Sequence, residues 1–191
     1  MKFLQLLLIV FLGMLLHSCK GRKNYDGDSV VNYPDMKMVF EENLKSYEQD
    51  PYTYKLIQSD GSEKDTSYLK AKDVKWKDLK KQFLEANLYR KELDKHYKID
   101  IFHDTLYGTL TMLLTALDPD AYTSSFSLKA RSSDNKIISV YIEARDAGFF
   151  STTEYKLLFV NGRTLQVQES IKRLFGSRKE RLTKLVFLNE E

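Results

Sequence analysis

Apolar and polar residues alternate along most of the second half of the chain, so that apolar side chains recur at every second position. A period of two is typical of strands that bury one face and expose the other. Short polar stretches with Asp, Asn, Ser or Gly separate the alternating runs and indicate turns. The pattern therefore predicts an antiparallel meander of about six strands over residues 98–188. The apolar positions of its clearest runs are Phe126, Leu128, Ala130, Val140, Ile142, Leu157, Phe159, Leu165, Val167, Leu185 and Phe187.

The first half of the chain carries apolar residues at helical spacing instead. Residues 35–49 place five of them on one stripe, which predicts a helix that ends before Pro51. A second stripe starts at Trp76 and includes Leu79, Phe83, Ala86, Leu93 and Tyr97, which predicts a helix of about six turns. Between the stripes, residues 52–57 and 66–70 alternate around Asp60-Gly61, and this pattern predicts a β-hairpin.

These elements together predict an α+β fold with two amphipathic helices, an early β-hairpin and the C-terminal meander. A sheet with one apolar face needs a second layer to bury that face. The second stripe is long and rich in aromatic residues, so we expect the sheet to curl over the second helix. At 191 residues the chain is expected to form one folded domain.

The chain begins with Met1-Lys2 and then a nearly unbroken apolar run to Leu16. The run is shorter than the about 20 residues that a membrane-spanning helix needs, and its layout is that of a secretory signal. Leu16, Ser18 and Cys19 resemble the lipobox of bacterial lipoproteins. The resemblance implies cleavage between Ser18 and Cys19, diacylation of the Cys19 sulfur and acylation of the new amino terminus. An ordinary signal peptide or an uncleaved anchor that ends in cysteine is the alternative.

The resemblance to lipoproteins also implies an organisation and a location. Residues 1–18 are the expected signal peptide, 19–34 a lipid-anchored tether, and 35–191 the single α+β domain. Lys20 follows the cysteine where an aspartate would retain a lipoprotein in the inner membrane, so the analogy favours the periplasmic face of the outer membrane. Several buried acyl chains hold a protein on a membrane far more firmly than one chain does.

Composition excludes some classes of protein. The chain has one cysteine, which rules out an internal disulfide framework. The formal net charge is +3, much less basic than a dedicated nucleic-acid-binding domain, so we expect no nucleic-acid partner. Two basic clusters stand out, one at residues 20–23 and one at 172–181. The second is interpreted either as a solvated loop or as a contact for lipid headgroups, lipopolysaccharide phosphates or an acidic partner.

The sequence contains no strong catalytic or metal-binding motif. His103-Asp104 could pair as base and orienting acid, but adjacent residues of a strand point to opposite faces. The carboxylates of Asp118 and Asp120 are interpreted as turn residues that bond their own backbone. Arg90, in the seam of the second helix, is interpreted as a side chain that extends over the edge of the apolar stripe, with a buried anion-binding guanidinium as the alternative. We therefore predict no catalytic, cofactor or metal residue, and Cys19 is the one residue with an assigned chemical role.

The resulting functional hypothesis is a lipid-anchored, non-catalytic accessory or scaffold protein of the cell envelope with a protein partner there. One alternative is a carrier of a lipid or hydrophobic small molecule, with an apolar pocket under the curved sheet. The residues expected to line that pocket are Phe83, Leu110, Met112 and Ile142. A second alternative is an enzyme that acts on envelope polymers.

Overall fold

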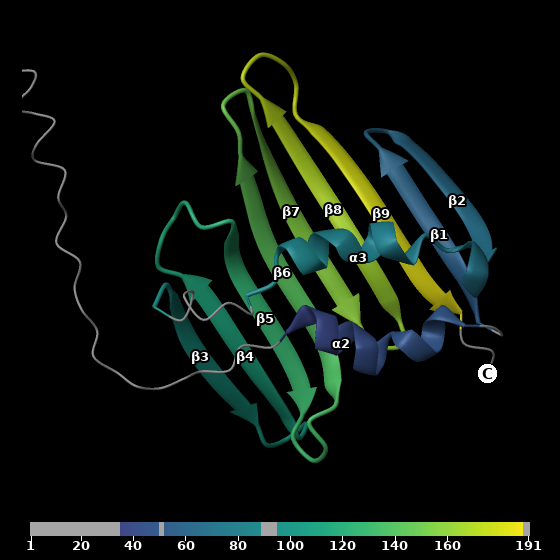
Figure 1. The fold of residues 1–191 in the computed structure, drawn as a ribbon, viewed down its shortest axis with the longest axis vertical. Helices are drawn as coiled ribbons and strands as arrows, with labels where there is room; N and C mark the ends of the chain where they lie inside the picture. The colour runs from purple at the N-terminus through teal and green to yellow at the C-terminus, as the bar shows by residue number, and fades with distance from the viewer. Residues whose placement is uncertain (1–34, 50–51, 89–94, 189–191) are drawn as a thin grey trace, which may run out of the picture. The chain divides into compact units, whose positions relative to one another are not determined.

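Nine antiparallel strands form one continuous sheet in the computed structural model, which describes residues 35–49, 52–88 and 95–188 (Figure 1). The strand order across the sheet is β2-β1-β9-β8-β7-β6-β5-β4-β3. The strands are β1 (Thr53–Asp60), β2 (Glu63–Lys70), β3 (Tyr97–Asp104), β4 (Thr109–Ala116), β5 (Thr123–Arg131), β6 (Ile137–Ala147), β7 (Ser151–Val160), β8 (Thr164–Arg173) and β9 (Lys179–Leu188). All described residues belong to one compact unit.

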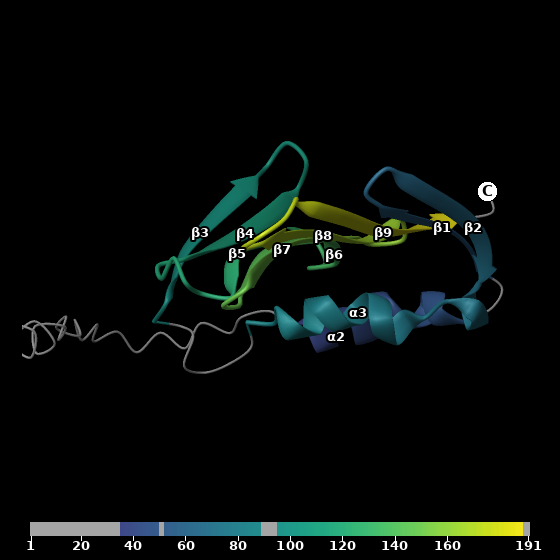
Figure 2. The ribbon, with the colours of Figure 1, turned by 90° about the horizontal axis from the view of Figure 1, so that it is seen from above.

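Two α-helices lie on one face of this sheet (Figure 2). They are α2 (Met36–Asn43) and α3 (Trp76–Glu85), and the short 3-10 helices η1 (Lys45–Glu48) and η2 (Ala71–Asp73) accompany them. Asp35 caps α2, because its carboxylate accepts the backbone N–H of Lys37 at 2.9 Å. Among the described elements, none covers the opposite face of the sheet, whose side chains are mostly polar and half-buried. No helix within the described ranges is long and apolar enough to span a bilayer.

The α+β prediction is wrong, since the described residues are 56% strand and 17% helix. The main cause is the second helix, because α3 ends at Glu85 with Ala86 as its cap, well short of six turns. Tyr97 belongs to β3, where its hydroxyl donates to the carbonyl of Thr123 at 2.8 Å. Tyr97 lies four residues after Leu93, a helical spacing, and was therefore assigned to the helix. Tyr97, Ile99 and Ile101 also recur at every second position, which is the spacing of a strand. Arg90 and Leu93 lie outside the described residues.

The early hairpin and the meander are parts of one sheet, a connection that the sequence pattern does not predict. Strand β1 pairs with β2 and also with β9, where Tyr54 stands opposite Phe187 and Leu56 opposite Leu185. The turn at Asp60-Gly61 is confirmed, with Gly61 at φ +65°. The meander from β3 to β9 has seven strands, one more than the approximate number expected.

The alternation identified the buried face of the strands correctly. Most of the apolar residues of β5 to β9 that were assigned to one face are buried. The alternation also assigned Tyr155 and Ile138 to this face, and both are only half-buried. The register shifts at the start of β6, so that Ile137 rather than Ile138 packs against the core.

The ring of Phe40 in α2 packs against both the other helix and the sheet. Its centroid lies 5.4 Å from that of Phe83 in α3 and 5.7 Å from that of Phe159 in β7, and both contacts are edge to face. These ring contacts fill the space between the two helices and β7.

Candidate functional site

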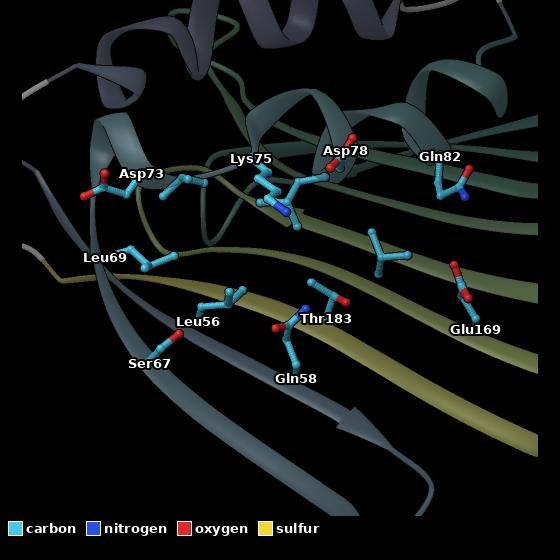
Figure 3. Close-up of a pocket in the computed structure, with 13 residues that line it drawn as sticks. Leu56, Gln58, Ser67, Leu69, Asp73, Lys75, Asp78, Gln82, Glu169 and Thr183 are labelled. Atoms are coloured by element: carbon cyan, nitrogen blue, oxygen red, sulfur yellow. The ribbon is translucent and has the colours of Figure 1, made fainter.

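A cleft of about 460 Å³ opens between α3 and the part of the sheet formed by β1, β2, β8 and β9 (Figure 3). Figure 3 shows Lys75, Asp78 and Gln82 on the helix side of this space. The apolar residues that line the cleft are Leu56, Leu69, Val74, Leu79 and Val167, and the polar ones are Gln58, Ser67, Asp73, Lys75, Asp78, Gln82, Glu169 and Thr183.

The cleft runs alongside α3, because the strands extend beyond the helix that crosses them (Figure 1). Trp76, the first residue of α3, packs on Tyr54 of β1 and Phe187 of β9, which are opposite each other in the sheet. Gln58 and Thr183 lie four positions further along the same two strands and line the cleft. The face of the sheet that carries the helices, called the helix face, therefore continues past α3 and forms the floor of the cleft.

Strand register brings the polar and apolar floor residues together. Gln58 of β1 pairs with Thr183 of β9, and Thr183 pairs with Val167 of β8. These three residues therefore form one row across the helix face. Leu56 lies in the adjacent row, one period along β1. The floor thus has apolar side chains beside amide and hydroxyl groups that can bond a ligand.

The charged groups of the cleft give it a net negative character. Asp73, Asp78 and Glu169 contribute carboxylates and Lys75 a single ammonium group. Within the described part of the chain, none of these four residues has a salt-bridge partner within 4.0 Å. The side-chain carbonyl oxygen of Gln82 is also buried, and it has no hydrogen-bond partner in the part of the chain that the structure describes. A buried polar atom of this kind is energetically costly unless a ligand or a water molecule donates a hydrogen bond to it. An occupant with a cationic, hydrogen-bond-donating head fits this arrangement.

The candidates for catalysis and metal binding lie away from this cleft. His103 and Asp104 are consecutive in β3, and the Nε2 atom of His103 lies 3.1 Å from the hydroxyl of Ser132. Asp104 accepts the backbone N–H groups of the turn that follows, at residues 106 and 107. Asp118 likewise accepts the N–H of Asp120 at 2.9 Å, as expected for a turn residue. In the residues that the structure describes, no group of three or more His, Cys, Asp or Glu side chains is placed to hold a metal ion.

The residues expected to line a carrier pocket do not line the cleft. Phe83 and Ile142 are completely buried in the packed core, and Leu110 and Met112 are half-buried on β4, towards the other end of the sheet. The lining of the cleft depends on the pairing of β1 with β9, which the periodicity of the sequence does not encode. One signal was available: the hairpin strands carry Leu56 and Leu69 on one face, and this apolar surface needs a cover.

The residues of the lipobox, Leu16, Ser18 and Cys19, lie outside the described residues. Comparison of the chain with protein-family models, with curated proteins and with solved structures finds no match.

Proposed function

We propose that this chain is a lipid-anchored protein of the cell envelope that binds a small amphipathic ligand in the cleft between α3 and the sheet, without catalysis. The ligand has an apolar body and a cationic head. Cys19 holds the protein on the periplasmic face of the outer membrane. The observation that carries the proposal is the cleft itself, with apolar and polar side chains side by side on its floor and an excess of carboxylates that form no salt bridge among the described residues.

The size and chemistry of the cleft support binding. Its volume of about 460 Å³ lies within the range of small-molecule sites, about 300–1,000 Å³. Such sites are lined mainly by apolar side chains, with a few polar groups that orient the ligand. Leu56, Leu79 and Val167 match the first requirement, and Asp78 with Glu169 matches the second. Buried contact with the floor supplies the affinity, and the carboxylates select the charge of the head.

The arrangement of the polar groups supports binding rather than chemistry. A nucleophile activated by a base requires two such side chains within hydrogen-bond reach of each other. In the described part of the cleft, no hydrogen bond joins any two of its polar side chains. The separated carboxylates are therefore interpreted as charge selectors.

A displacement assay tests the ligand site. The probe is Nile red, a neutral solvatochromic dye, bound to the mature chain with Cys19→Ser so that no acyl chains interfere. Decylammonium and decyl sulfate, which share an alkyl chain and differ in the charge of the head, then compete with the dye below their micelle-forming concentrations. We expect the ammonium compound to displace the dye at about tenfold lower concentration, because the carboxylates attract it.

Two adjacent substitutions locate the binding. Thr183 faces the cleft, whereas Lys184 is the next residue of β9 and faces the opposite side of the sheet. Thr183→Trp should fill the cleft and abolish dye binding, and Lys184→Trp should leave it unchanged. Equal binding by both variants, or preference for decyl sulfate, would contradict the proposed site.

The anchor has its own test. Cys19→Ser removes the proposed acylation site, and we expect this variant to leave the membrane fraction when membranes are washed at high salt. The unsubstituted chain should resist the same wash, because buried acyl chains are insensitive to salt. A Cys19→Ser variant that stays with the washed membranes would refute lipid anchoring.

A further inference from the structure

Two loops at one end of the sheet expose a concentration of apolar side chains. Figure 1 shows the β6–β7 and β8–β9 connections side by side at the upper end of the sheet. Phe149 and Phe150 come from the first connection and Leu174 and Phe175 from the second, and we call these four residues the tip. Phe149 is 87% exposed and Phe175 86%, more than any other aromatic side chain among the described residues. Exposed apolar groups gathered in this way mark an interaction surface.

The tip is a defined structure that joins both loops. The backbone N–H of Leu174 donates to the carbonyl oxygen of Phe150 at 2.9 Å. The rings of Phe149 and Phe150 pack edge to face, with their centroids 4.8 Å apart. Gly148 closes the first loop, because its N–H donates to the carbonyl of Ser151 at 2.9 Å. The four apolar side chains are therefore presented together from neighbouring backbone.

Cations without ion-pair partners surround a hollow of about 240 Å³ behind the tip. Arg145, Lys172 and Arg173 line this hollow together with Phe149 and Phe150. Among the described residues, none of these three cations has a carboxylate within 4.0 Å.

The other cations near the tip are already paired. Arg178 lies 3.5 Å from Glu154, the one carboxylate of the hollow, and 3.4 Å from Glu180. Lys179 and Arg181 both approach Asp60, at 2.8 Å and 3.6 Å. The uncompensated positive charge is therefore concentrated in the hollow.

We propose that the tip docks on a lipid bilayer that contains anionic phospholipids. Phe149, Phe150, Leu174 and Phe175 enter the boundary between headgroups and acyl chains, while the three unpaired cations contact lipid phosphates. The position of the cations behind the apolar side chains supports a bilayer as the partner. Arg173 precedes Phe175 by two residues, so the charges lie about 5–10 Å behind the apolar ends. That offset matches the depth at which interfacial segments bury their apolar groups below the headgroups, about 5–10 Å.

Docking at the tip would also place the cleft beside the membrane. Glu169 lines the cleft and Lys172 lines the hollow. The two residues are three positions apart on β8, a separation of about 10 Å. The docking inference does not depend on the proposed ligand, since the tip and the cleft share no residue.

Vesicle co-sedimentation tests the proposal with the mature chain carrying Cys19→Ser, so that binding reports the folded surface. The vesicles are phosphatidylcholine alone, or phosphatidylcholine with about one quarter phosphatidylglycerol. We expect at least tenfold tighter binding to the anionic vesicles, weakening as salt is raised. Arg145→Gln/Lys172→Gln/Arg173→Gln should remove that preference, and Phe149→Ser/Phe175→Ser should weaken binding about tenfold or more.

Matched controls keep the result specific to the tip. Leu106 is 83% exposed in the β3–β4 connection at the other end of the sheet, so Leu106→Ser should leave binding unchanged. Lys129→Gln on β5 is the control for charge. Phe149→Trp should shift its emission to the blue and be quenched by brominated lipids only when anionic vesicles are present. Circular dichroism and thermal unfolding confirm that every variant is folded.

Other outcomes would overturn the proposal. Equal binding to both vesicle types, or equal loss with Leu106→Ser, would show that the tip does not recognise anionic lipid. Displacement by millimolar inorganic phosphate would indicate a phosphate site without insertion. Tighter binding to polyglutamate than to the anionic vesicles would assign the surface to an acidic protein instead.

Discussion

The N–H of Leu174 and the carbonyl of Phe150 form a 2.9 Å hydrogen bond between two loops that are separated in the sequence by strands β7 and β8. This bond is a consequence of the meander, because every second connection of such a sheet lies at the same end. It turns two exposed hairpin loops into one surface. The effect of this hydrogen bond on docking can therefore be tested separately from the effect of the apolar side chains of the tip.

Leu174→Pro removes the donor of this bond, since proline has no backbone N–H. We expect binding to anionic vesicles to fall several-fold while the free energy of unfolding changes by only about 1 kcal/mol, the net contribution of one hydrogen bond. Leu174→Ala keeps the N–H and shortens the side chain. A loss with Leu174→Ala as large as with Leu174→Pro would show that the bond does not matter. Vesicle co-sedimentation and urea unfolding provide both measurements.

Two consecutive residues of α3 differ in how deeply they are buried, and we expect their substitutions to differ in their effect on stability. Phe83 is completely buried against Phe40, whereas Leu84 is 43% exposed on the same helix. Phe83→Ala should lower the free energy of unfolding by about 3–5 kcal/mol, because it removes a large buried side chain and leaves a cavity. Leu84→Ala should change it by only about 0.5 kcal/mol. Similar costs for the two variants in urea unfolding would contradict the described packing of α3.

The β7–β8 turn restricts Gly162 more severely than other turn glycines. Gly162 has φ +67°, and a Cβ atom built on it would lie 2.9 Å from the hydroxyl of Tyr47. Gly108 has φ +59° with no atom within 4 Å of its Cβ position. Gly108→Ala should therefore cost about 1–2 kcal/mol for the left-handed backbone alone, and Gly162→Ala distinctly more.

Tyr47→Phe removes the atom that crowds Gly162, so it should reduce the cost of Gly162→Ala in a double-mutant cycle. Thermal unfolding of the single and double variants gives the coupling. Additive effects would show that the turn and η1 are not in contact.

The alkaline stability of the protein depends on partly buried tyrosines. Burial, together with the 2.7 Å hydrogen bond to Glu143, raises the pKa of Tyr141 to about 12. Burial likewise raises the pKa of Tyr122 to about 12. The folded state therefore holds these protons more tightly than the unfolded state, whose tyrosines titrate near 10. The stabilisation is complete below pH 10 and is lost as the pH rises towards about 12.

Tyr141→Phe should reduce the fall in the free energy of unfolding at alkaline pH by about 1 kcal/mol. This value allows for solvent screening, since the side chain of Tyr141 is only partly buried. Urea unfolding at pH 8, 10 and 11.5, compared with the same series for Tyr107→Phe at an exposed tyrosine, measures the difference. A slope identical to that of the unsubstituted protein would contradict the assignment.

The strand faces could be predicted from the sequence because they are encoded locally. Each side chain of a strand points opposite to the next, so Val140 and Ile142 or Leu157 and Phe159 identify the buried face without knowledge of any partner strand. The long second helix could not be predicted correctly by the same means. Its stripe ends at Tyr97, where a helical spacing from Leu93 and a strand alternation with Ile99 and Ile101 overlap, and the pairing of β3 with β4 places Tyr97 in the sheet.

The candidate sites depend on contacts between distant residues and were therefore largely missed. Val167 and Leu56 both line the cleft because β9 lies between β8 and β1, and no local pattern encodes that strand order. The basic residues at 172–181 were recognised, whereas Phe149 and Phe150 were not. The signal for them was present in the predicted meander, whose alternate turns must lie together.

The most direct test of the proposed function is a methyl-detected nuclear magnetic resonance titration of the mature Cys19→Ser chain with decylammonium. We predict saturable shifts centred on the methyl groups of Leu56, Leu69, Val74, Leu79 and Val167, which line the cleft. Methyl groups of Leu110 and Leu174, which lie away from the cleft, should stay unchanged. Shifts confined to the tip, or cleft methyl groups that do not respond, would contradict ligand binding between α3 and the sheet.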